Sequence, residues 1–136
     1  MRYARLACLW ALCFAVTAGC SDSGGSSEAA DAATPGGIET LARCLTNEGW
    51  VMYSSFTCGV CRVQKELFAD AARYIQTVEC HPNADYSQSE RCLEKKIRKT
   101  PTWIRERDDE EFERLVGYQS LDVLAAESSC PDPAGG

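Results

Sequence analysis

Two cysteines separated by two residues, Cys58 and Cys61, are the residues of this chain best suited to chemistry. The apolar run from Trp50 to Tyr53 precedes them and an amphipathic stretch from Arg62 to Tyr74 follows, so the pair stands where a strand gives way to a helix. At a helix N-terminus, unpaired backbone N–H groups and the helix dipole favour a thiolate over a thiol. The spacing also brings the second sulfur within reach of the first. The pair therefore predicts a reversible dithiol/disulfide redox centre.

The two sulfurs are expected to have different roles. Cys58 comes first and should be the more exposed, which makes it the nucleophile, and Cys61 lies one turn into the helix and resolves the mixed disulfide. The strand before the pair contains no carboxylate that could move the proton of Cys61. Glu79 is a candidate substitute, with an exposed strand-end residue as the alternative. Arg62 could stabilise the thiolate, with a solvated helix face as the alternative.

The N-terminus has the pattern of an export signal. A basic start, Met1 to Arg5, is followed by an apolar run from Leu6 to Ala18. That run is too short to cross a bilayer as a helix, which takes roughly 20 residues. It matches the apolar region of a secretory signal peptide, which we expect to occupy residues 1–19.

The four residues Thr17-Ala18-Gly19-Cys20 look like a lipobox, at which bacterial lipoproteins are cut and lipidated on the cysteine. Thr17 departs from the usual Leu, whereas the small residues after it fit. We therefore expect Cys20 to carry lipid and to anchor the chain at the extracytoplasmic face of a bacterial membrane, in the periplasm. The alternative is ordinary signal cleavage near Gly19, which would leave Cys20 as a free thiol.

The rest of the chain divides into three parts. Residues 20–37 are rich in Ser, Gly, Ala and Asp and predict a flexible linker. Residues 38–132 are long enough for one compact domain, and residues 133–136 predict a disordered tail. The formal net charge of −6 makes a nucleic-acid-binding function a poor fit, because that function needs a basic surface.

Cysteine usage points to an oxidising compartment. The chain has nine cysteines, of which two leave with the signal peptide and Cys20 is assigned to lipid. Six remain in the predicted domain, an even number that implies pairing in an exported protein. They are Cys44, Cys58, Cys61, Cys80, Cys92 and Cys130.

Six cysteines allow 15 connectivities, so each pairing needs an argument. Cys80 and Cys92 flank a polar loop, residues 81–90, and a disulfide between them would join a strand end to the next helix. By elimination Cys44 pairs with Cys130, which would tie the first helix to the last. Both are expected to be structural disulfides.

Hydrophobic spacing predicts eight elements in the order α-β-α-β-α-β-β-α. Their expected ranges are 38–49, 50–55, 59–74, 75–80, 87–97, 102–106, 111–116 and 121–127. Val60 and Val63 are expected on the buried face of the second helix, and Ser87 to Glu90 as a capping box. A helix crosses between the first two strands, so they should be parallel, and the last two form a hairpin. This predicts a mixed four-stranded sheet with helices on both faces, the thioredoxin-like α/β arrangement.

Thr100-Pro101 supports this arrangement independently. A proline before a strand could simply mark a turn. In the thioredoxin fold, however, a cis-proline at this point lies against the CxxC pair and shapes the groove in which the substrate backbone docks. We therefore expect Thr100 and Pro101 to bind substrate.

Short stretches spread over most of residues 38–126 combine into a more specific pattern. They are Leu41-Ala42, Met52-Tyr53, Phe56, Cys58-x-x-Cys61, Gln64-Lys65-Glu66-Leu67-Phe68, Val78-Glu79-Cys80, Cys92, Pro101-Thr102-Trp103, Gly117 and Ser120-Leu121. With them the chain resembles the thioredoxin-like domain found fused to bacterial vitamin K epoxide reductase homologues. The resemblance implies that Cys58 and Cys61 are the redox pair and that Cys80 and Cys92 form a structural disulfide.

The same resemblance implies a protein thiol-disulfide oxidoreductase without a cofactor. In that family a fused membrane domain passes electrons to quinone. This chain shows no such domain, so we expect an oxidant of protein thiols that is recharged by a separate, vitamin K epoxide reductase-like membrane protein. The alternatives are a thiol reductase recharged by a membrane electron donor, and a binding lipoprotein whose cysteine pairs are only staples.

A structural zinc site is a further alternative, because paired Cys-x-x-Cys elements bind zinc. Cys58, Cys61, Cys80, His81 and Cys92 could supply its ligands. Only one Cys-x-x-Cys is present, however, and its distance from Cys80 fits no zinc ribbon or finger. We expect no metal, and we expect His81 to be a loop residue.

Overall fold

A computed structural model describes residues 33–135 of the chain. The predicted signal peptide, the lipidation site Cys20 and most of the predicted linker lie outside the described residues. The elements are α1 (Pro35–Asn47), β1 (Trp50–Ser54), α2 (Gly59–Glu66), the 3₁₀ helix η1 (Ala69–Tyr74), β2 (Gln76–Glu79), α3 (Ser89–Glu94), β3 (Thr102–Arg107), β4 (Glu110–Val116) and α4 (Leu121–Ser128).

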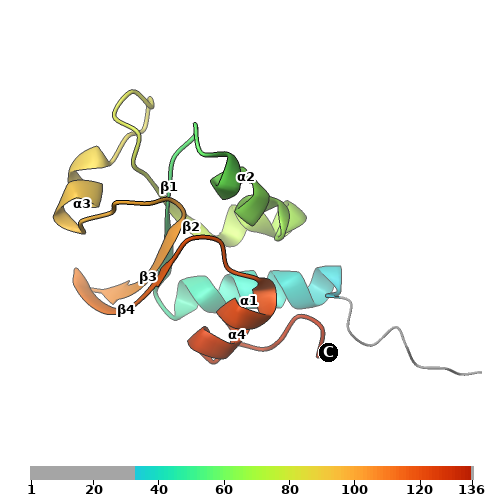
Figure 1. Cartoon of the computed structure of the whole chain (residues 1–136). Coiled ribbons are helices and arrows are strands. Elements are labelled where there is room, and N and C mark those ends of the chain that lie inside the picture. Colours follow the sequence, from blue (N-terminus) through green and yellow to red (C-terminus); the bar gives the residue numbers. More distant parts are fainter. Residues whose placement is uncertain (1–32, 136) are drawn as a thin grey trace, which may run out of the picture.

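The four strands form one mixed sheet in the order β2-β1-β3-β4 (Figure 1). Strand β1 pairs with β2 in parallel and with β3 antiparallel, and Met52 of β1 lies opposite Thr77 and Trp103. Strands β3 and β4 form an antiparallel hairpin, in which Asp108 and Asp109 of the turn both have positive φ. The predicted thioredoxin-like α/β fold is confirmed.

The sheet is buried on both faces. All five residues of β1 are buried. Because side chains alternate along a strand, Trp50 and Met52 join the larger core under α1, η1 and α4, whereas Val51 and Tyr53 join a smaller core. That smaller core includes Cys92 of α3. In Figure 1, α1 and α4 lie together and α3 lies apart from them. The helices therefore hold β1, and with it the Cys-x-x-Cys pair that follows, in a fixed place.

The ends of the domain differ from the expected boundaries. Helix α1 begins at Pro35 instead of Ile38, because the Thr34 side chain caps it by accepting a hydrogen bond from Gly37 N–H at 3.0 Å. Pro133, expected in a disordered tail, is buried, and its carbonyl accepts a hydrogen bond from Thr34 N–H at 3.1 Å. The two ends of the domain thus hold each other in place.

The predicted single helix over residues 59–74 is two helices. Helix α2 ends at Glu66, and Ala69 has a φ of +45°, a left-handed conformation that an α-helix cannot contain. Phe68, buried between the two, fills the core beside Trp103, with ring centroids 6.0 Å apart. Burial of this aromatic side chain overrides the helical periodicity of the sequence.

The predicted capping box at Ser87 to Glu90 is wrong. Helix α3 begins at Ser89 after an N-cap Gln88 that makes no side-chain capping bond, and Ser87 Oγ accepts a hydrogen bond from Ser89 N–H. The helix ends at Glu94 instead of Ile97, and Lys96 has a φ of +54°. The left-handed conformation of Lys96 turns the chain back, so that Ile97 N–H donates to Cys92 O at 2.8 Å and the helix cannot continue.

Candidate active site

Cys58 is the N-cap residue of α2. Strand β1 delivers the chain to a turn in which Cys58 N–H donates to Ser55 O, and Cys58 then takes an extended conformation with φ −84° and ψ 108°. Its sulfur accepts a hydrogen bond from Cys61 N–H at 3.1 Å. An N-cap atom lies at the positive end of the helix dipole and close to unpaired N–H donors. This position stabilises negative charge on the Cys58 sulfur.

The structure joins Cys58 to Cys61 in a disulfide, with Cα atoms 5.3 Å apart. Cys58 is half-buried, whereas Cys61 is only 1% exposed. An attacking sulfur can therefore reach Cys58 and is kept away from Cys61. The order of exposure is the one expected from their places in the sequence.

Thr100 and Pro101 lie directly beside Cys58. The peptide bond between them is cis, and the Thr100 carbonyl oxygen lies 3.4 Å from Cys58 Sγ. A disulfide sulfur carries no hydrogen, so this contact becomes a hydrogen bond only when Cys58 is a thiol. The Pro101 carbonyl accepts a hydrogen bond from Gly117 N–H at 2.8 Å, which attaches this loop to the end of β4. Thr100 is 42 residues after Cys58 in the sequence, and the fold brings it and Pro101 to the redox pair.

Gln64 supports the site and was not expected from the sequence. It is fully buried, its Nε2 donates to Gln119 O at 2.9 Å, and its Oε1 accepts from Gln119 N–H at 2.7 Å. The buried face of α2 carries Cys61 and Gln64, and Val60 and Val63 are exposed by 50% and 46%. The prediction that the two valines face the core is therefore wrong. The N-cap position of Cys58 turns Cys61 inward, and this sets the phase of the helix.

Glu79, at the end of β2, is buried, so the alternative that it is an exposed strand-end residue is wrong. It is 4% exposed, and its Oε1 accepts hydrogen bonds from Phe56 N–H at 3.2 Å and His81 N–H at 2.8 Å. These bonds connect the loop before Cys58 to the loop after β2. The Phe56 and His81 rings also contact each other edge to face, with centroids 4.7 Å apart. Glu79 thus positions the loop that carries the redox pair.

Arg62 lies on the solvated face of α2. Its side chain is largely exposed and its Nε lies 3.7 Å from Glu66 Oε1, one helical turn away. An exposed pair of this kind contributes little. The basic charge of Arg62 is therefore directed at Glu66.

The other four cysteines of the described chain form two further disulfides. Cys44 is joined to Cys130, with Cα atoms 5.9 Å apart, and Cys80 to Cys92, with Cα atoms 5.6 Å apart. Within residues 33–135, no group of three His, Cys, Asp or Glu side chains is arranged to hold a metal ion. No helix of this part of the chain is long and apolar enough to cross a bilayer.

A buried ionic network on the other face of the sheet was also missed. Glu106 of β3 is 8% exposed and forms an ion pair with Lys95 at 2.7 Å, a second ion pair with Arg91, and a hydrogen bond from Tyr53 OH at 2.9 Å. Burial by itself would raise the pKa of Glu106. The hydrogen bonds from Lys95 and Tyr53 and the charge of Arg91 outweigh it and lower this pKa below its usual value of 4.5. The network ties α3 to β1 and β3.

Tyr53 responds in the opposite sense. Burial, followed by its hydrogen bond to the Glu106 carboxylate, raises the pKa of Tyr53 to about 12. The phenol therefore stays protonated and donates to Glu106 at any physiological pH. In the sequence, Tyr53 stands among apolar strand residues. Nothing there indicated that it would donate a hydrogen bond to a buried carboxylate.

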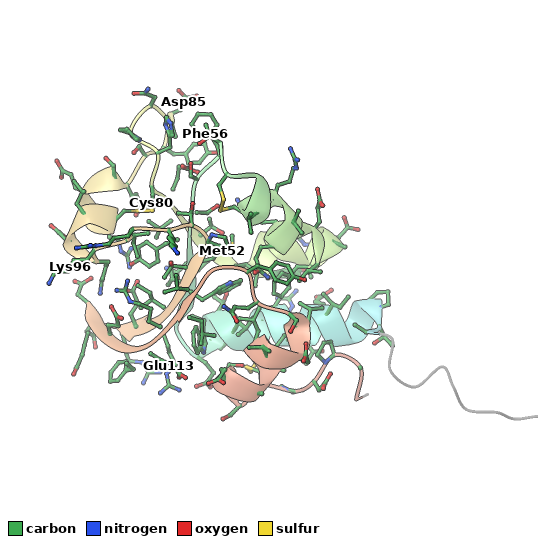
Figure 2. The ribbon with its side chains drawn as sticks, viewed as in Figure 1. Met52, Phe56, Cys80, Asp85, Lys96 and Glu113 are labelled. Carbon is green, nitrogen blue, oxygen red and sulfur yellow. A yellow bond between two sulfur atoms is a disulfide. The ribbon has the colours of Figure 1, made fainter. Side chains whose placement is uncertain are left out.

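The surface around Cys58 has an apolar rim. Phe56 is 59% exposed and, with Tyr86 and neighbouring loop residues, lines a pocket of about 290 Å³. Figure 2 shows Phe56 and Asp85, both of which line this pocket, together at one end of the molecule. A large unfolded or extended partner could bury these side chains on docking.

Comparison with known proteins finds two similar proteins. Thiol-disulfide oxidoreductase LTO1 from Arabidopsis thaliana is 38% identical to the chain over 69 residues, which span 47% of this chain and 18% of that protein. The solved thioredoxin f2 from Chlamydomonas reinhardtii superposes with a TM-score of 0.46 and 19% identity, covering 57% of this chain and 72% of that one. No protein-family model matches the chain. The chain is thus similar, over about half its own length and less than a fifth of the relative's, to a thiol-disulfide oxidoreductase.

Proposed function

We propose that this protein is a thiol-disulfide oxidoreductase that exchanges disulfides with other proteins through Cys58 and Cys61. One observation carries the proposal: a half-exposed sulfur caps a helix, is bonded to a buried second sulfur and lies 3.4 Å from the Thr100 carbonyl. A structural staple also has a bonded second sulfur, but it needs neither an accessible sulfur nor a helix-capping position. An exchange centre needs an accessible sulfur, a stabilised thiolate and a resolving partner.

In the oxidising direction, a substrate thiolate attacks Cys58 Sγ and the Cys58–Cys61 bond breaks. Cys61 leaves as a thiolate and takes up a proton, and Cys58 is now bonded to the substrate. A second substrate thiolate then attacks the substrate sulfur of this mixed disulfide, and Cys58 leaves as a thiolate that the helix N-terminus stabilises. Two electrons have passed from the substrate dithiol to the Cys58–Cys61 pair.

The neighbouring backbone positions the partner. The Thr100 carbonyl faces Cys58, and Pro101 is fixed to β4 through Gly117. A partner chain that lies along this loop brings its cysteine to Cys58 in an extended conformation. Thr100 and Pro101 are therefore the proposed substrate-binding residues, and the disulfides Cys44–Cys130 and Cys80–Cys92 are structural.

Net oxidation is the proposed direction, and it needs an acceptor for the two electrons. The resemblance to domains fused to vitamin K epoxide reductase homologues supports a membrane protein that passes them to quinone. A lipid on Cys20, at the end of the linker, would hold the domain near such a partner at the extracytoplasmic face of the membrane and raise its effective concentration.

The test is to trap a mixed disulfide in cells with Cys61→Ser. In this variant the Cys58 thiolate attacks a substrate disulfide, which is the reverse of the second step above, and no Cys61 thiolate is present to displace the substrate and re-form the Cys58–Cys61 bond. We expect covalent complexes, sensitive to reductant, that disappear in the matched Cys58→Ser/Cys61→Ser variant. A quinone-linked membrane protein among the captured partners would support oxidation, and a membrane electron donor would overturn that direction. A Cys61→Ser protein that is folded and captures nothing would overturn the exchange function itself.

A further inference from the structure

The connection between α3 and β3 carries an unneutralised positive charge. Lys96, Arg98 and Lys99 are all exposed. None of the ion pairs formed within residues 33–135 includes any of the three. The chain as a whole has a formal net charge of −6. A basic segment on an acidic protein, with no internal counter-charge in the described structure, is available to a partner of opposite charge.

This basic segment leads directly into the candidate active site. Lys99 precedes Thr100, whose carbonyl oxygen lies 3.4 Å from Cys58 Sγ. Consecutive Cα atoms are about 3.8 Å apart, so the backbone of Arg98 lies within roughly two residue lengths of Thr100. A partner chain that extends from Cys58 along this connection would therefore pass the basic segment.

A groove runs along the basic segment, and its lining residues include those on either side of the Thr100-Pro101 loop in the sequence. It encloses about 310 Å³ and is lined by Lys96, Arg98, Lys99, Thr102, Arg114 and Val116. Thr102 pairs with Val116 across the β3–β4 hairpin, next to the bond between Gly117 N–H and the Pro101 carbonyl. Figure 2 shows Lys96 beside α3, well away from Phe56 and Asp85. The groove and the apolar rim thus lie on different parts of the surface.

The geometry points to a specificity of this groove for acidic protein segments: a partner whose reactive cysteine has Asp or Glu within a few residues. This inference rests on the proposed exchange function and names its substrate class. An extended chain advances about 3.3 Å per residue, so carboxylates roughly two to five residues from the cysteine would reach the groove. Arg98 and Lys99 would attract them and align the chain along the Thr100-Pro101 loop.

A general effect of charge on the reactivity of Cys58 has to be separated from docking. Such an effect would change the rate of exchange with every partner alike. Specific docking, in contrast, changes the ratio of rates between acidic and neutral partners. The net negative charge of the protein would by itself favour a basic partner, so a preference for acidic partners has to come from the local field.

The experiment uses the full chain with Cys61→Ser, which leaves Cys58 as a thiol. Three peptides of the same length carry one cysteine in a mixed disulfide with thionitrobenzoate, flanked on both sides by Asp, Asn or Lys. The Cys58 thiolate attacks the peptide sulfur, the peptide–thionitrobenzoate bond breaks, and coloured thionitrobenzoate leaves as a thiolate. Peptide mapping by mass spectrometry counts only the adduct on Cys58.

Two variants in the Cys61→Ser background are compared. Arg98→Gln/Lys99→Gln removes the groove charges, and Arg105→Gln/Arg107→Gln removes two charges towards the far end of β3. We expect the Asp peptide to react about fivefold faster than the Asn peptide at low salt, with a difference below about twofold in the groove variant. The control variant should keep the full ratio.

Three results would overturn the inference. The Lys peptide could react fastest, the ratio could survive in the groove variant, or the control variant could lose it equally. In each case adduct formation with the Asn peptide would leave the exchange function intact. Absence of a Cys58 adduct with all three peptides in folded protein would instead overturn the exchange function, and this inference with it.

Discussion

At the scale of single residues, the position of Cys58 accounts for the chemistry. Its sulfur serves as a helix cap, accepting the Cys61 N–H, and its partner sulfur is buried. Glu79 holds the preceding loop in place from the neighbouring strand through two backbone N–H groups. The reactive sulfur is therefore accessible, but the backbone that carries it is fixed.

Replacement of Glu79 by Ala should destabilise the domain and slow exchange. The N–H groups of Phe56 and His81 would lose their acceptor, which costs about 1–3 kcal/mol in free energy of unfolding. Glu79→Gln keeps a carbonyl oxygen and should recover most of both losses. Urea denaturation and single-turnover exchange measure the two effects, and a Gln variant as slow as the Ala variant would contradict the positioning role.

Glu106 gives the domain a dependence on acid. Its pKa is lowered in the folded state, so its contribution to stability is present above the usual carboxyl value of 4.5 and is lost as the pH falls through the folded value. Glu106→Gln should cost about 2 kcal/mol at neutral pH, because Lys95 and Arg91 lose a buried partner. The difference from the wild type should shrink below pH 4.5. Urea denaturation over the pH series tests this, and a difference independent of pH would contradict it.

Tyr53 gives a matching dependence on alkali. Its pKa rises from 10.0 to about 12, so its protonated form adds stability that is full below pH 10 and declines as the pH rises towards 12. Phenylalanine cannot ionise, so the free energy of unfolding of Tyr53→Phe should fall less than that of the wild type as the pH rises from 10 towards 12. The ultraviolet absorbance of tyrosinate during alkaline titration identifies the group, and a Tyr53 that titrates with the exposed tyrosines would contradict the prediction.

At the scale of elements, α2 owes its orientation to Cys58 and Gln64. The helix is short, and a buried amide anchors it to the loop between β4 and α4 through Gln119. The same loop region holds Pro101 through Gly117. The two halves of the site, the redox pair and the Thr100-Pro101 loop, are therefore aligned through one shared support.

Gln64→Leu should misalign the site as well as destabilise the fold. The N–H and carbonyl of Gln119 would be left without their partners, which costs about 2 kcal/mol or more. Exchange with a protein substrate should slow by more than the loss of folded protein explains, whereas the exposed control Val63→Leu should leave both quantities unchanged within error. Equal exchange rates in folded Gln64→Leu and wild type would contradict the alignment argument.

The sequence predicted the order and pairing of the strands well and the helices less well. Alternation and strand-helix order identify β1, β2 and the final hairpin, because a buried strand has a simple pattern. Val60 and Val63 misled the periodicity argument for α2, since exposed apolar side chains cannot be told from core residues in a sequence pattern. The positioning roles of Gln64 and Glu79 could not be predicted, because Gln64 bonds to the backbone of Gln119 and Glu79 to that of Phe56, both far away in the sequence.

At the scale of the whole molecule, disulfides and terminal contacts close the domain. Cys44 in α1 is joined to Cys130 just after α4, at a sequence separation of 86 residues. Close to them, Thr34 bonds to Pro133. The boundaries of the domain could not be predicted, because residues 35–37 and Pro133 show no hydrophobic periodicity in the sequence. Only the contact between the two ends of the domain orders them.

Removal of the long-range disulfide should destabilise the domain without altering its chemistry. Cys44→Ala/Cys130→Ala should lower the free energy of unfolding by about 4 kcal/mol, because a long loop is released in the unfolded chain. At a temperature at which the variant stays folded, exchange through Cys58 should be unchanged. Urea denaturation and single-turnover exchange measure these, and a stable but inactive variant would contradict a purely structural role.

The most direct test of the account is the order in which the three disulfides of the domain are reduced. The folded protein is treated with increasing amounts of a mild dithiol, free thiols are alkylated, and mass spectrometry identifies the modified cysteines. The account predicts that Cys58 and Cys61 are reduced first, while Cys44–Cys130 and Cys80–Cys92 stay intact. If all three bonds resist equally, or if Cys58–Cys61 is the last to open, the pair is a staple and the proposed exchange function is wrong.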